Sequence, residues 1–131
     1  MSDAGDTFFT AIGCMDGRVQ DPVAEFGREK FDVRFADTIT EAGLVGLFQS
    51  NLSDEFVSNL KKKIAVSIEK HHSKGIIIHG HQECAGNPID DETHKEHVRK
   101  AARFIRNFAP DTEVIPVFVV KKDGEWKALP L

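Results

Sequence analysis

Two cysteines and one histidine are the residues whose types and spacing could hold a metal ion. His81 and Cys84 stand three residues apart, directly after an apolar, β-branched run at 76–78, so a nitrogen and a sulfur can converge as the chain turns. Cys14, the other cysteine, ends a second apolar run at 7–13. Two cysteines, one histidine and an open fourth position form a ligand set of zinc enzymes. The pattern therefore predicts one zinc ion, Zn2+, bound by Cys14, His81 and Cys84.

Two other interpretations of the cysteines remain open at this point. The two thiols can be unrelated buried residues, or they can form a Cys14–Cys84 disulfide in a redox protein. Two cysteines in a chain of 131 residues do not suggest a disulfide-rich scaffold. Metal content would separate a disulfide from a zinc site.

The remaining sequence predicts the elements that must position these residues. Strands are expected at 7–13, 31–39, 76–81 and 113–120, a hairpin turn at 122–125 leads back through 126–129, and helices are expected at 21–30, 53–72 and 91–108. This alternation predicts an α/β fold in a single domain, residues 1–131, with a central, mostly parallel sheet of about four or five strands flanked by helices and a C-terminal hairpin strand. Ligands in such sheets bind beyond the carboxyl ends of strands where the strand order reverses. Cys14 and His81 would meet there if their strands are neighbours.

Two local signals mark the expected helix starts. Asp21-Pro22 resembles an N-cap followed by proline in the first turn, and Ser53 precedes two acidic residues, as a helix cap does. The stretch at 43–51 is ambiguous.

Charge and hydropathy exclude several classes of partner. The formal net charge is −4, which gives no electrostatic footprint for nucleic acid. No apolar run approaches the roughly 20 residues needed to span a membrane. Residues 1–6 are acidic and lack the pattern of a secretory signal, so we expect a cytoplasmic protein.

A homodimer is also expected. A sheet of this size has edges that can pair, and Leu44, Leu47 and Phe48 could form an apolar face that nothing later in the sequence obviously covers.

Two motifs together resemble those of the beta-class carbonic anhydrases. Residues 14–18 read Cys-x-Asp-x-Arg and residues 81–84 read His-x-x-Cys, about 65 residues apart with a strand–helix–strand pattern between them. The local contexts also match, since each motif follows an expected strand and glycine stands directly before the ligand His81. The resemblance covers roughly residues 7–129.

The resemblance implies a function and the roles of five residues. Cys14, His81 and Cys84 would be the zinc ligands, and Asp16 and Arg18 the catalytic pair that controls the fourth coordination position. Zinc-bound hydroxide would attack carbon dioxide and give bicarbonate, which makes the expected activity that of a carbonic anhydrase, a lyase. Asp16 would be a fourth ligand in a closed state if Arg18 released it. The family also implies a cleft at the subunit interface of a dimer.

Two alternatives use the same zinc site. One is a hydrolase of carbonyl sulfide or carbon disulfide, and the other is a non-catalytic zinc-binding or regulatory module that is closed by Asp16. The sequence departs from the family pattern at two places. Residues 40–43 read Thr-Glu-Ala-Gly where the family has an Arg-Asn-Ala-Gly type of sequence, and Ala85 separates Cys84 from Gly86.

Other histidines could compete for a site role. His79 lies two residues before His81 and therefore on the same face of the strand, where we expect it to pack or to support the ligands. His94 and His97 lie three apart on an expected helix, where we expect an exposed pair rather than a metal or proton-relay site.

Overall fold

The structure of the chain, a computed structural model, describes residues 5–50 and 52–131, so residues 1–4 of the acidic N-terminus lie outside the described part. It confirms the α/β class, with five strands in one sheet of order β2-β1-β3-β4-β5. The strands are β1 (Phe8–Cys14), β2 (Phe35–Glu41), β3 (Ile76–His81), β4 (Val114–Lys122) and β5 (Glu125–Pro130). The first four strands are parallel, and β5 is antiparallel to β4.

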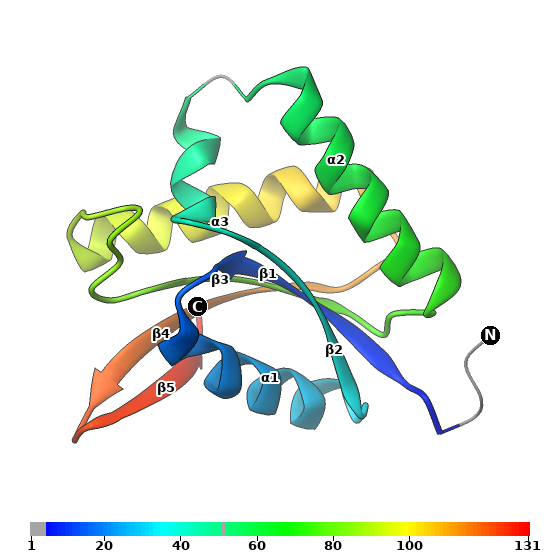
Figure 1. Cartoon of the computed structure of the whole chain (residues 1–131), viewed down its shortest axis with the longest axis horizontal. Coiled ribbons are helices and arrows are strands. Elements are labelled where there is room, and N and C mark those ends of the chain that lie inside the picture. Colours follow the sequence, from blue (N-terminus) through cyan, green and yellow to red (C-terminus); the bar gives the residue numbers. More distant parts are fainter. Residues whose placement is uncertain (1–4, 51) are drawn as a thin grey trace.

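Helices cover both faces of the sheet (Figure 1). They are α1 (Gly17–Phe31) on one face and the 3-10 helix η1 (Leu44–Gln49), α2 (Asp54–Ala65) and α3 (Asp91–Phe108) on the other. Alternate residues of the central strands therefore enter two cores: Ile12, Ile76 and Ile78 face the η1, α2 and α3 side, whereas Phe9 and Ile77 face α1. Among the described residues, no helix is both long and apolar enough to cross a membrane.

The strand order brings β1 and β3 together. The chain adds β2 on one side of β1 and then crosses over to add β3 on the other, so the order reverses between β1 and β3. Their register pairs Ile12 with Ile78 and Gly13 with His79. The expected neighbourhood of the two ligand-bearing strands is confirmed.

Helix α1 begins earlier than expected. Asp16, not Asp21, is its N-cap, because the Asp16 carboxylate accepts a hydrogen bond from the backbone N–H of Arg18 at 2.9 Å. Pro22 lies inside the helix, where it removes one backbone donor. The prediction that Asp21-Pro22 opens the helix was wrong, because the Asp16 carboxylate caps the chain five residues earlier.

Strand β2 is shifted toward the C-terminus from the expected 31–39. Phe31 ends α1, and Asp32 follows as a left-handed C-cap with φ 52°. The Phe31 ring packs against Phe9 instead of joining the sheet, with ring centroids 5.9 Å apart.

The expected apolar surface around η1 was also wrong. Leu44 and Phe48 are buried in the core, where Phe48 makes edge-to-face contacts with Phe56 and Phe104. Leu47 alone of the three is exposed, at 37%. The 3-10 turn thus directs two of the three apolar residues inward, under α2 and α3.

The end of α2 continues into a π-helical turn at Val66–Lys70 and is attached to the sheet by a polar network. Ser67 donates a hydrogen bond to Asp37 at 2.7 Å and lies 2.7 Å from the hydroxyl of Thr10. His71 also contacts Asp37, with Nδ1 at 2.7 Å from the carboxylate. The helix expected to run regularly up to residue 72 thus ends as an α-helix at Ala65 and continues as a π turn, from which Ser67 reaches the sheet.

Candidate metal centre

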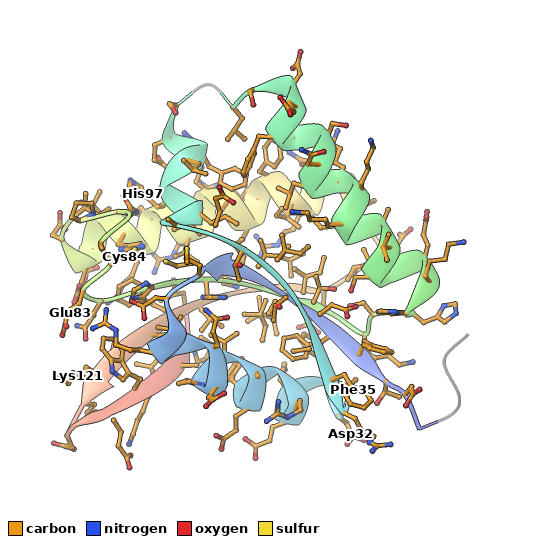
Figure 2. The ribbon with its side chains drawn as sticks, viewed as in Figure 1. Asp32, Phe35, Glu83, Cys84, His97 and Lys121 are labelled. Carbon is orange, nitrogen blue, oxygen red and sulfur yellow. The ribbon has the colours of Figure 1, made fainter. Side chains whose placement is uncertain are left out.

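The three candidate ligands meet at the carboxyl ends of β1 and β3. Cys14 is the last residue of β1, His81 is the last residue of β3, and Cys84 follows after a short turn. All three side chains are buried, and their ligand atoms lie within 4.8 Å of one another. In Figure 2, Cys84 lies at the opposite end of the molecule from Phe35, the first residue of β2.

The separation of the two sulfur atoms fits a shared metal ion. Cys84 Sγ lies 3.8 Å from Cys14 Sγ, and both cysteines are free within the described part of the chain. A disulfide needs about 2.05 Å, whereas two sulfurs each about 2.3 Å from one zinc ion in tetrahedral geometry would be about 3.8 Å apart. Cys14, His81 and Cys84 could therefore bind a metal, and two thiolates with one imidazole suit zinc.

The imidazole of His81 is oriented as a metal ligand needs. Its Nδ1 lies 2.6 Å from the carbonyl oxygen of Gln82, so Nδ1 carries the proton and donates it there. Its Nε2 is buried and has no hydrogen-bond partner among the described residues. An unpaired buried acceptor is costly, and histidines that bind metals characteristically donate from the other ring nitrogen. When the ring is neutral, Nε2 thus has the free electron pair that a metal would use.

The two thiols differ in acidity. Burial alone would raise the pKa of Cys14, but the facing imidazole of His81 and the Gly43 N–H outweigh it and lower that pKa to about 7. Burial and the neighbouring Cys14 raise the pKa of Cys84. The environment therefore favours a thiolate at Cys14, the form that binds metals and reacts as a nucleophile.

Two glycines bring the loops around Cys14 together. Gly43 has a left-handed φ of +59° and donates its N–H to Cys14 Sγ at 3.4 Å. A Cβ on Gly43 would lie 2.4 Å from the carbonyl carbon of Gly86, and a Cβ on Gly86 would lie 2.6 Å from the Gly43 nitrogen. The departures from the family pattern at Glu41 and Ala85 therefore leave in place the glycines that this close backbone approach requires.

Asp16 and Arg18 form an ion pair beside the ligands. Arg18 donates from Nη2 to Asp16 Oδ2 at 2.7 Å and from Nε to Oδ1 at 3.0 Å. These hydrogen bonds lower the pKa of Asp16 to about 2, so its carboxylate is ionised at neutral pH. Asp16 Oδ2 lies 3.9 Å from His81 Nε2, yet among the described residues only Cys14, His81 and Cys84 form the potential ligand group. The carboxylate is thus next to the cluster and bound to Arg18.

His79 packs in the interior, in line with its expected role. Its ring lies over Gly13, where a Cβ would come within 2.3 Å of the His79 Cε1 atom. Burial lowers the pKa of His79 to about 3, which keeps the ring neutral at physiological pH.

His94 is buried, contrary to the expectation of an exposed pair. Its ring packs 5.3 Å from Phe118 and lies over Gly80, where a Cβ would come within 2.7 Å of His94 Nε2. Burial, followed by the charges of His81 and His97, lowers the pKa of His94 to about 4. His97 is half-buried, and its Nδ1 accepts a hydrogen bond from the Asn87 side chain at 3.1 Å. The missing side chain at Gly80 is what admits His94 to the interior.

Gln82 gave no signal in the sequence beyond its place between two ligands. Its Oε1 accepts a hydrogen bond from the backbone N–H of Lys121 at 2.8 Å, and its Nε2 donates to Asp91 at 2.7 Å. Gln82 therefore ties the turn that carries the ligands to the end of β4 and to the start of α3.

Comparison with known proteins agrees with this geometry. A family model described as "Putative carbonic anhydrase" matches residues 4–129. The chain belongs to this family. A search of curated proteins finds no match to it. Among solved structures, the crystal structure of a carbonic anhydrase from Streptococcus mutans is similar in fold, with a TM-score of 0.57 and 18% identity, covering 91% of this chain and 80% of that chain. The resemblance to carbonic anhydrases is thus confirmed for family and fold.

Gly43→Ala should disrupt the candidate metal centre of this carbonic anhydrase family member. The new Cβ would meet the Gly86 backbone and strain a left-handed residue, so we expect the free energy of unfolding to fall by about 2–4 kcal/mol. We also expect metal affinity to fall, because the displaced backbone would move the N–H of residue 43 away from the Cys14 sulfur. Urea unfolding and elemental analysis measure both effects.

Gly124→Ala is the matched control. Gly124 also has a positive φ, +80°, but no described atom lies within 4 Å of a Cβ built there. It should cost about 1 kcal/mol from backbone strain alone and leave the metal content unchanged. Equal losses in the two variants would show that the contact with Gly86 is unimportant.

Proposed function

We propose that this chain is a zinc-dependent lyase that catalyses the reversible hydration of carbon dioxide to bicarbonate. The observation that carries the proposal is a buried cluster of two sulfurs and one imidazole nitrogen, unpaired among the described residues, in a member of a carbonic anhydrase family. Cys14, His81 and Cys84 would hold the zinc ion. When bound, zinc lowers the pKa of a coordinated water to about 7 and so supplies a hydroxide nucleophile near neutral pH.

The Asp16–Arg18 pair supports catalysis over a closed, non-catalytic site. Asp16 Oδ2 is 3.9 Å from His81 Nε2, near enough to accept a hydrogen bond from a water beside the cluster and to orient it. Arg18 occupies both carboxylate oxygens and thereby keeps Asp16 from serving as a fourth ligand. This arrangement would leave the fourth coordination position to water and substrate.

Cys84→Ser should remove zinc. The protein purified without added metal should contain one zinc ion per chain by elemental analysis, and the variant should contain none. Ligands from two strands also act as a cross-link, so the variant should lose roughly 3 kcal/mol or more of stability, the stabilisation given by a ligand well above its Kd. His97→Ala, which changes a half-buried histidine outside the cluster, should keep the metal. A wild-type protein that is folded and metal-free, with oxidised cysteines, would contradict the zinc assignment.

Arg18→Ala should close the site. The freed Asp16 carboxylate can bind zinc directly, so the variant should retain its metal and lose carbon dioxide hydration by on the order of tenfold or more, because each 1.4 kcal/mol favouring a closed state lowers the open fraction about tenfold. Adding Asp16→Ala to Arg18→Ala should recover part of the loss. Stopped-flow hydration assays measure these rates.

Two outcomes of these assays would redirect the proposal. Equal hydration by wild type and Arg18→Ala would show that the pair does not control the metal. A wild type that holds zinc without hydrating carbon dioxide, but consumes carbonyl sulfide or carbon disulfide, would identify the hydrolase alternative.

We also propose that the chain forms a homodimer. Strands β2 and β5 are the edges of the sheet, and an edge of seven residues such as β2 offers free backbone groups to a partner strand. The buried Leu44 and Phe48 no longer contribute to this proposal. Sedimentation at micromolar concentration should show a dimer, and a monomer there would refute it.

A further inference from the structure

Glu83 has an unusual backbone conformation in the turn between two candidate ligands. Its φ is +56°, in the left-handed region that non-glycine residues rarely adopt. Its side chain is more than half exposed, so core packing does not account for the conformation. Backbone strain of this kind often has a functional cause, which the contacts of the residue can reveal.

The left-handed turn presents two oxygens of Glu83 to one guanidinium. Arg18 Nη1 donates to Glu83 Oε1 at 3.2 Å, and Arg18 Nη2 donates to the Glu83 carbonyl oxygen at 3.1 Å. The same Nη2 donates to Asp16 at 2.7 Å. Arg18 is therefore shared by the carboxylate beside the metal cluster and by the turn that carries Cys84.

Trp126 contacts the same guanidinium through its ring. The Arg18 Cζ atom lies 4.8 Å from the centre of the Trp126 ring, within the range of a cation–π contact. Trp126 belongs to β5, the antiparallel edge strand, and its ring is also 6.4 Å from that of His81 in an edge-to-face arrangement. One aromatic side chain thus lies against both Arg18 and a candidate ligand.

The elements that supply these contacts are themselves fixed to each other. Trp126 pairs in the β4–β5 ladder with Lys121, whose backbone N–H donates to Gln82, the residue before Glu83. In Figure 2, Glu83, Cys84 and Lys121 lie at the same end of the molecule. The turn and the hairpin therefore hold their two contacts to Arg18 in a constant relative position.

We propose that Glu83 and Trp126 are positioning residues that fix Arg18 where it holds Asp16 away from the metal ligands. This inference rests on the metal site of the proposed function. The Arg18 side chain is 45% exposed and can adopt many rotamers. An ion pair with Asp16 as its one partner would therefore form only part of the time. The hydrogen bonds to Glu83 and the contact with the Trp126 ring would restrict the orientations that the guanidinium can adopt. The left-handed backbone of Glu83 is explained by this role, because it aims the carbonyl and the carboxylate at the same group.

Anion binding to the cobalt-substituted protein tests this role without measuring turnover. An open fourth position accepts azide and changes the visible spectrum of cobalt, whereas Asp16 on the metal excludes it. Glu83→Gly keeps the left-handed backbone and its carbonyl but removes the carboxylate, and Trp126→Leu removes the aromatic face. At one fixed pH, each should weaken azide affinity by roughly threefold, as expected for losing one exposed charge-assisted or cation–π contact, and the double variant by roughly tenfold.

Three further variants separate positioning from general damage. Adding Asp16→Ala to the double variant should restore azide affinity, because no carboxylate then competes for the metal. Trp126→Phe, which keeps a smaller aromatic face, should recover most of the azide affinity that Trp126→Leu loses.

Glu96→Gln is the matched control. It removes the carboxylate of another exposed Glu–Arg pair, that with Arg99 on α3, and the variant should bind azide as wild type does. Cobalt content and thermal unfolding are measured for each variant. If Trp126→Leu does not fold, the azide affinities of Glu83→Gly with and without Asp16→Ala test the positioning role.

The results distinguish this proposal from the proposed function. Wild-type azide affinity in the double variant, or a loss that Asp16→Ala does not restore, would overturn the positioning role. A wild type that binds azide as described yet does not hydrate carbon dioxide would keep the positioning role and refute the activity. A wild type that binds no cobalt would refute both.

Discussion

The parallel pairing of β1 with β3 is the contact on which the candidate metal centre depends. It aligns Gly13 with His79, so that both strands end at the same edge and bring their terminal residues together. The pairing tolerates no side chain at Gly13, because the His79 ring occupies that space. Two ligands are thereby placed by strand ends that are buried on both faces, and rigid elements hold side chains more precisely than loops do.

A second layer of polar contacts surrounds this edge. Arg18, at the start of α1, reaches the turn after β3 and the ring on β5, while Gln82 joins the same turn to β4 and α3. Five segments, α1, the turn after β3, α3, β4 and β5, are therefore linked through two side chains. Such outer contacts orient the groups that touch a metal and commonly matter almost as much as the ligands.

The features that could be predicted from the sequence are those determined by neighbours along the chain. The β-branched run at 76–78 is enough to place His81 at a strand end, and the three ligands and the Asp–Arg pair all lie in short motifs. Features determined by tertiary contacts were not predictable. Helix α1 starts early because Asp16 both caps it and binds a guanidinium, and His94 is buried because Gly80 leaves it space. The two residues that contact that guanidinium from the β3 turn and from β5 had no local signal, since only the completed sheet brings them near.

The separation of the ligands along the chain has a consequence for folding. Cys14 and Cys84 are 70 residues apart, and contacts between such distant residues form slowly because a long loop must close first. The segment from β3 onward contains only two of the three ligands, His81 and Cys84, and cannot complete the cluster by itself. A metal ion that needs all three candidate ligands would therefore bind only after the chain has crossed over and β1 has paired with β3. Such an ion would stabilise the finished sheet, but it could not nucleate it.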